Sequence, residues 1–293
     1  MRDPRLDRLA HVLVHYATGV KAGELVRISG DPIATDALEA IYEAVLEVGA
    51  HPVVRSTPDA CGDRLLEIGN DDQLDYVDPL ARHEIETIDV SIGLWAETNT
   101  RSRTRMDPAR IARRSAARRP IMETFMKRAA DGDLRWCGTL FPTAASAQDA
   151  EMSLRQYEEF VFAAGHLDAD DPVARWQEIQ TRQQKVVDWL NGKKELRFLA
   201  DNGTDLTVNV DGMTWINCCG HENFPDGEVF TGPNLDAGDG GVNGVVRYHF
   251  PAVYQGREVH DIELTFEGGR VVEAKASKGE AFLHEMLDQD DGA

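Results

Sequence analysis

One carboxylate in the sequence follows a turn that would hold it in a fixed direction. Residues 223–231 read NFPDGEVFT, so Glu228 comes directly after Pro225-Asp226-Gly227 and is followed by β-favouring residues. Pro presets φ for a tight turn, Asp tolerates the turn and Gly adopts a positive φ. We therefore expect a rigid turn at the start of a strand, and this turn would direct the Glu228 side chain toward a functional site. An ordinary solvated carboxylate is the alternative, because most Glu side chains are exposed.

A second group of reactive side chains precedes this turn. The segment CCGHE at 218–222 contains two thiols, an imidazole and a carboxylate. Thiolate and imidazole are ligands for zinc and other soft metals. Neighbouring residues of a strand point to opposite faces, however, so Cys218 and Cys219 are poorly placed to form one site with His221. The sequence leaves open a local metal site or a turn that buries its Cys side chains.

Three further patterns resemble known sites but also have plain structural explanations. His11 and His15 have the spacing of a helical zinc pair, yet VLV lies between them, without a Glu to act as a base. The segment HEMLD at 284–288 begins like H-E-x-x-H but has Asp288 where the second His belongs, which also suits a solvated helix face. The glycine-rich DAGDGGVNG at 236–244 precedes a strand and not a helix, so we expect a hairpin loop without bound phosphate.

The elements that position these residues change in type near residue 193. Before that point, apolar segments such as GELVRISG, HPVVRST, IETIDVSIGLWA and RWCGTLFPT alternate with helical patterns, including one over 107–131 that we expect to be interrupted at Pro120. Such alternation predicts crossovers and a mostly parallel sheet. After it, short β segments follow one another between Gly, Asn and Asp turns. We predict an α/β protein with an N-terminal α/β domain and helical extension over 1–192 and a β-rich domain over 193–293.

Composition excludes several classes of protein. The chain has 293 residues and a formal net charge of −20, which would repel a nucleic-acid backbone. The longest apolar runs are too short to span a bilayer and the N-terminus lacks the apolar core of a signal peptide, so we expect a cytoplasmic protein without membrane association. The four Cys form neither a disulfide framework nor a zinc-finger spacing. Only seven of the 31 basic residues are Lys, and this acid-rich, Lys-poor composition favours a salt-adapted, halophilic source.

Several segments taken together resemble one known family. The segments GELVRISG, EVGAHPVVR, TDLTVNVDGMTW, NFPDGEVFTGP and LTFEGGRVVEAKASKGEAFLHEMLDQDDGA are similar, in this order along almost the whole chain, to dinuclear-metal aminopeptidases of the thermophilic metalloprotease, AmpS-like type. PDGEVFT is the most specific of these blocks. The resemblance implies a metal-dependent aminopeptidase that releases N-terminal residues from peptides and forms homodimers.

The resemblance also assigns a role to Glu228. In the family pattern the Glu of GEVFT is a metal ligand, one of several that hold two divalent ions such as zinc, cobalt or manganese. The other ligands of that pattern, in a GEF motif and in later His and Asp motifs, follow a segment like DQDDGA, where this sequence stops. Glu228 is therefore the only recognisable ligand, and the catalytic and substrate-binding residues are unassigned.

Two expectations follow from this comparison of motifs. We expect an N-terminal fragment of about three quarters of such an enzyme, with an incomplete β-rich peptidase domain, little activity on its own and a tendency to aggregate. The alternative is a non-catalytic α/β binding or dimerisation module that has lost its metal centre.

Overall fold

The computed structural model describes residues 2–238, 240–254 and 257–288. The chain divides into two compact units, the first formed by residues 1–180 and 218–227 and the second by 181–217 and 228–293. The domain boundary near residue 193 stays a prediction. The sequence pattern gave no sign that residues 218–227 belong with the first unit, because so short a segment has no periodicity of its own.

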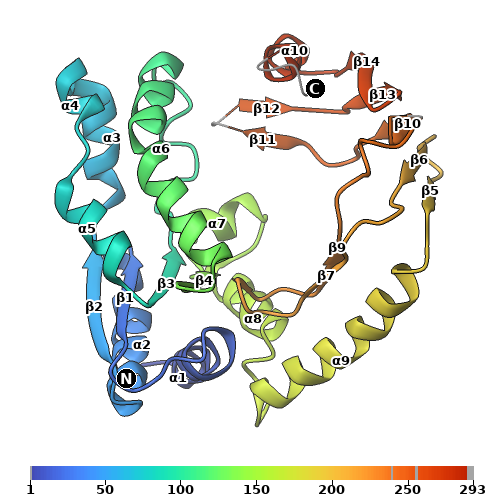
Figure 1. The fold of residues 1–293 in the computed structure, drawn as a ribbon. Coiled ribbons are helices and arrows are strands. Elements are labelled where there is room, and N and C mark those ends of the chain that lie inside the picture. The colour runs from blue at the N-terminus through green and yellow to red at the C-terminus, as the bar shows by residue number, and fades with distance from the viewer. Residues whose placement is uncertain (1, 239, 255–256, 289–293) are drawn as a thin grey trace. The chain divides into compact units, whose positions relative to one another are not determined.

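The first unit contains a five-stranded parallel sheet with the order β2-β1-β3-β4-β8 (Figure 1). Fully buried apolar side chains occur at alternate positions of its central strands. Examples are Val26, Ile28, Val90 and Ile92, which all have 0% exposure. These side chains pack against the first helices of the chain, so one face of the sheet forms the main core. The strands are β1 (Leu25–Gly30), β2 (His51–Ser56), β3 (Val90–Trp95), β4 (Arg135–Leu140) and β8 (Asn223–Phe224).

Helices cover both faces of this sheet. On the second face a smaller apolar cluster forms around Ile85, Ile88 and Leu134. The helices of this unit are α1 (Pro4–His11), the π-helix η1 (Val12–Ala17), the 3₁₀-helix η2 (Pro32–Ala34), α2 (Thr35–Glu47), α3 (Asp59–Ile68), α4 (Asp71–Asp75), α5 (Pro79–Thr87), α6 (Pro108–Ala130), α7 (Ala144–Asp149) and α8 (Leu154–Ala164). Helix α9 (Pro172–Leu190) begins in this unit and continues into the second.

The expected interruption at Pro120 was wrong. Helix α6 runs without a break from Pro108 to Ala130 with Pro120 inside it. Pro120 removes one backbone donor from the helix. Its carbonyl oxygen accepts a bond from the Thr124 hydroxyl at 2.9 Å, and α6 also packs against α3, α4 and α5. These tertiary contacts outweigh the local cost, as packing usually does for helices in proteins.

The second unit is rich in β structure. A five-stranded antiparallel sheet has the order β14-β13-β10-β6-β5, and β11 pairs separately with β12. The strands are β5 (Glu195–Leu199), β6 (Asp205–Asn209), β10 (Val242–Arg247), β11 (Ala252–Tyr254), β12 (Arg257–Val259), β13 (Glu263–Glu267) and β14 (Arg270–Lys275), and they are followed by helix α10 (Glu280–Leu287). A parallel α/β sheet followed by an antiparallel β-rich part confirms the predicted fold class.

Within the described residues, no helix is both long and apolar enough to cross a membrane. The glycine-rich segment 236–244 does not form the expected hairpin, because β10 pairs with β6 and β13 and not with the strand that precedes the segment. Residue 239 of this segment lies outside the described residues.

Candidate metal centre

Glu228 is the first residue of strand β9 (Glu228–Phe230), which pairs with β7 (Ile216–Cys218) in a two-stranded sheet. The turn before it has the predicted form. Gly227 has a φ of 129°, which favours Gly, and its N–H donates to Oδ1 of Asp226 at 2.9 Å. The Phe224–Pro225 peptide bond is cis. Glu228 is therefore held between a tight turn and a strand.

Phe224 anchors the residues that lead into this turn. Asn223 and Phe224 form β8, which extends the parallel sheet next to β4. The Phe224 side chain is 2% exposed, and its ring centroid lies 5.3 Å from that of Trp176. Trp176 is itself 1% exposed, and its indole N–H donates to the carbonyl oxygen of Gly165 at 3.0 Å. Two buried aromatic rings thus fix the chain four residues before Glu228.

Gln183 connects helix α9 to both β7 and β9. Its side chain, on α9, is buried, and its Nε2 donates to Oδ1 of Asn217 at 3.0 Å and to the backbone carbonyl of Glu228 at 2.9 Å. A primary amide has two N–H donors, so one side chain can make both bonds. Because the carbonyl of Glu228 is held in this way, the position of its backbone, from which the side chain projects, is fixed.

The turn and the strand pairing bring three possible ligands together. The Cys218 sulfur and one carboxylate oxygen each from Asp226 and Glu228 lie within 4.8 Å of one another. Cys218 and Asp226 are half-buried and Glu228 is exposed. All three residues come from the short stretch 216–230, so the local pairing of β7 and β9 sets their arrangement. In the part of the chain that the structure describes, this is the only group of three or more such side chains.

The chemistry of these donors fits a divalent cation. One thiolate and two carboxylates suit zinc, which accepts both sulfur and oxygen ligands, and also borderline ions such as cobalt. Ligands at about 2.0–2.3 Å from one ion lie a few ångströms from one another, as the three donor atoms do here. Three protein donors also leave a coordination position open, as catalytic zinc sites do.

The sequence suggested Glu228 but not its two neighbours in this cluster. The sequence predicts only a turn role for Asp226, although the spacing Asp226-Gly227-Glu228 places two carboxylates on one short segment. The sequence groups Cys218 with Cys219 and His221 and not with Glu228, because the pairing that brings β7 to β9 has no signal in so short a strand.

The CCGHE segment does not form a metal site of its own. Cys219 is buried, burial raises the pKa of its thiol, and its carbonyl accepts a bond from the Tyr16 hydroxyl at 2.9 Å. The His221 ring stacks on Tyr16 with centroids 4.8 Å apart, and its Nδ1 lies 3.2 Å from the carbonyl oxygen of Ala17. Cys219 and His221 thus pack against the first helical segment, while Cys218 turns to the carboxylates.

The other histidine patterns do not form metal sites among the described residues. The rings of His11 and His15 lie 4.4 Å apart on the exposed side of the first helical segment, and neither belongs to a group of three possible ligands among the described residues. His284 and Glu285 are exposed on α10, and Glu285 forms an ion pair with Arg257 at 3.6 Å. These contacts agree with a solvated helix face.

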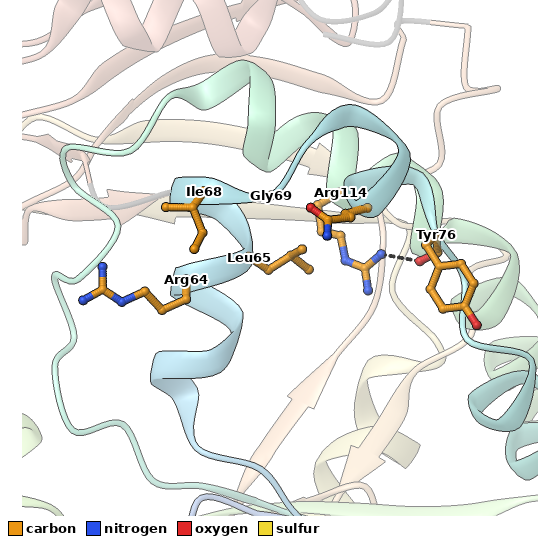
Figure 2. A pocket seen from close by; sticks show the side chains of 7 residues that line it. Arg64, Leu65, Ile68, Gly69, Tyr76 and Arg114 are labelled. Atoms are coloured by element: carbon orange, nitrogen blue, oxygen red, sulfur yellow. Dashed lines mark hydrogen bonds between the residues drawn. The ribbon is translucent and has the colours of Figure 1, made fainter.

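A separate hollow of about 530 Å³ lies among α3, α4 and α6. Figure 2 shows Leu65 and Ile68 on α3 and, across from them, Arg114, which donates to the carbonyl oxygen of Tyr76 at 2.6 Å. The lining of the hollow contains two Arg and no carboxylate, thiol or imidazole side chain. The lining residues are Arg64, Leu65, Ile68, Gly69, Gln73, Tyr76 and Arg114. This hollow therefore lacks the side chains that usually bind a metal ion.

The fold and the donor cluster define a mixed α/β protein with a candidate metal centre. The chain belongs to the thermophilic metalloprotease (M29) family, whose model matches residues 2–293. Aminopeptidase 2 of Geobacillus stearothermophilus is 33% identical over 204 residues, which are 64% of this chain and 48% of that protein. Aminopeptidase AmpS of Bacillus subtilis (strain 168) is 35% identical over 169 residues, 54% of this chain and 39% of the relative. The resemblance seen in the sequence is thereby confirmed.

A solved structure shares the fold. Wild-type AmpT from Thermus thermophilus superposes with a TM-score of 0.83 at 24% identity, over 98% of this chain and 75% of that one. The matched region spans less than half the length of the two curated relatives.

Proposed function

We propose that this chain is part of a metal-dependent aminopeptidase, in which Glu228 supplies a ligand to a divalent ion. Membership of the M29 family and the aminopeptidase names of the relatives support the reaction class. The observation that carries the site is the convergence of Cys218, Asp226 and Glu228 within 4.8 Å.

Each of the three side chains has a distinct part in this proposal. The exposed carboxylate of Glu228 would supply one ligand to the ion. The half-buried Cys218 and Asp226 would supply two more. A divalent ion bound there supplies Lewis acidity, which polarises a peptide carbonyl and lowers the pKa of water. Phe224 and Gln183 would keep the donors in place.

The number of donors limits the activity that we expect. A dinuclear centre, as the family resemblance implies, needs more ligands than the one cluster found among the described residues. We therefore infer that residues 1–293 alone turn over substrate slowly. Homodimerisation and a cytoplasmic location stay predictions.

Release of p-nitroaniline from aminoacyl-p-nitroanilides, with added zinc, cobalt or manganese, tests this proposal. We expect slow release that depends on the metal and is lost in Glu228→Gln but retained in Glu222→Gln, a neighbouring exposed carboxylate. Release without metal, or release that survives Glu228→Gln, would contradict the proposal. Rapid metal-dependent release would contradict the inferred slow turnover.

A further inference from the structure

A charged cavity of about 560 Å³ lies in the first unit, and none of its lining residues belongs to the candidate metal centre. Its lining includes the last residues of β1 and β3, among them Ser29, Gly30, Gly93 and Trp95. The sheet order changes direction here, because β2 lies on one side of β1 and β3 on the other. Crevices at the carboxyl ends of parallel strands, at such a switch point, are where open α/β sheets bind ligands. The volume suits a small molecule.

The middle of strand β1 contributes the guanidinium of Arg27, a largely buried charge that is only partly paired. Arg27 projects from the centre of β1 and lies opposite Ser91, to which its Nη2 donates at 2.8 Å. Its Nη1 lies 3.8 Å from Glu84, and its buried Nε has no hydrogen-bond partner among the described residues. Burial also lowers the pKa of the guanidinium. An incompletely paired buried charge is unfavourable, so this arrangement suggests that another anion completes it.

Positive charge exceeds negative charge at this side of the cavity. Glu84 is shared with a second guanidinium, Arg55, at 2.7 Å. Arg118, from α6, also lines the cavity and makes no hydrogen bond or ion pair within the described residues. Three guanidiniums therefore face one carboxylate, in a chain whose net charge is −20. Such a group of Arg side chains suits the carboxylate or phosphate of a ligand.

Negative charge collects at the other side of the same cavity. Both carboxylate oxygens of Asp31 accept backbone bonds, from Ile33 and from Asp59. The carboxylate of Asp59 has no ion pair within the described residues, and burial together with Asp31 and Asp63 raises its pKa. The lining of the cavity thus has a cationic side and an anionic side, which suits a zwitterion better than a simple anion.

We propose that this cavity binds a short peptide of about two residues, with its carboxylate toward Arg27, Arg55 and Arg118 and its ammonium group toward Asp59. The register supports this length. Arg55 pairs with Ser29, two residues before Asp31, whose carboxylate accepts the backbone N–H of Asp59; between these backbone positions the strand covers about 7 Å. Two extended residues span about the same distance. The site goes beyond the proposed metal centre and does not need it.

Calorimetric titration of the chain with the dipeptide Ala-Ala, in the presence of EDTA, tests this proposal. We expect Ala-Ala to bind and both N-acetyl-Ala-Ala and Ala-Ala-amide to bind at least about tenfold more weakly, because each lacks one charge. Inorganic phosphate is the probe for a simple anion site. Phosphate or N-acetyl-Ala-Ala binding as tightly as Ala-Ala, or no binding of Ala-Ala at millimolar concentration, would overturn the proposal.

Exposed residues of the cavity provide variants that should fold normally. We expect Arg118→Gln and Asp59→Asn each to weaken Ala-Ala binding at least about tenfold. The matched control is Arg119→Gln, which changes the next exposed Arg on the same helix and should bind Ala-Ala like the unmodified chain. Equal binding by Arg118→Gln would contradict the assignment. Because EDTA is present, Glu228→Gln should also bind normally, so failure of the aminopeptidase proposal and failure of this one give different results.

Discussion

Truncating Phe224 should destabilise the protein more than truncating any exposed Phe, because this side chain holds the segment before Glu228 in the core. It is 2% exposed and packs on Trp176 at a centroid distance of 5.3 Å. A Cβ added at Gly165 would lie only 3.0 Å from its ring, which shows how closely the site encloses it. Replacing a buried Phe by Ala costs about 3–5 kcal/mol, and a site that cannot collapse lies at the upper end.

Different substitutions of Phe224 separate the contribution of its apolar volume from that of its aromatic contact with Trp176. We expect Phe224→Ala to lower the free energy of unfolding by about 4–5 kcal/mol, a large share of the ~5–15 kcal/mol of a typical domain. Phe224→Leu keeps most of the apolar volume but loses the aromatic pair with Trp176, so we expect a loss of about 1–2 kcal/mol. Phe250→Ala is the matched control, because Phe250 is 84% exposed and its truncation should change stability by less than about 0.5 kcal/mol.

Urea unfolding followed by circular dichroism measures these differences as shifts in midpoint at constant slope. Zinc binding in the absence of urea provides a second measurement. The folded fraction of Phe224→Ala should bind zinc more weakly, because the turn before Glu228 has lost its anchor. A cost for Phe224→Ala no larger than that for Phe250→Ala would refute this reasoning.

Three further substitutions test the supports of the site and the pH response of the first helical segment. Gly220→Ala should cost about 1–3 kcal/mol in urea unfolding, because φ is +95° and the new Cβ would lie 3.3 Å from the Phe224 ring, whereas Gly192→Ala, with nothing within 4 Å, should be nearly neutral. Gln183→Met keeps the volume but removes both amide bonds, so we expect a loss of about 1–3 kcal/mol and weaker zinc binding; unchanged values would contradict the role of Gln183. Partial desolvation of the His15 ring and the neighbouring His11 lower the pKa of His15 below its ordinary value of 6.5, so the unfolded chain binds more protons and stability should fall as the pH falls below about 6.5. His15→Gln should flatten that slope, and an identical pH profile would contradict the assignment.

Local patterns predicted the fold well where the signal is contained in a single segment. The apolar strands before residue 193 and the turn before Glu228 depend on neighbouring residues, and the structure has both. Pro120 was misjudged because tertiary packing of α6 outweighs a local rule. The helices α3, α4 and α5 were not predicted, since each is short and buries only one apolar side chain: Leu66, Leu74 or Ile85.

The candidate site was predicted less completely than the fold. Glu228 is predicted as a ligand from its turn and from the family resemblance, but Cys218 becomes its neighbour only through the pairing of β7 with β9. Strands of three residues are too short to show a period, so their partners depend on the rest of the fold. The charged cavity at β1 and β3 was also not predicted, because its Arg and Asp side chains come from segments far apart in the sequence.

The affinity for zinc of the unmodified chain and of Glu228→Gln, measured by calorimetric titration, tests the candidate metal centre most directly. Loss of an outer partner of a metal ligand already costs about 10–100-fold in affinity, so loss of the ligand itself should cost at least about tenfold. Glu222→Gln, which removes a nearby exposed carboxylate, should bind zinc as the unmodified chain does. Equal zinc affinity of Glu228→Gln and the unmodified chain would contradict the assignment of Glu228 as a ligand.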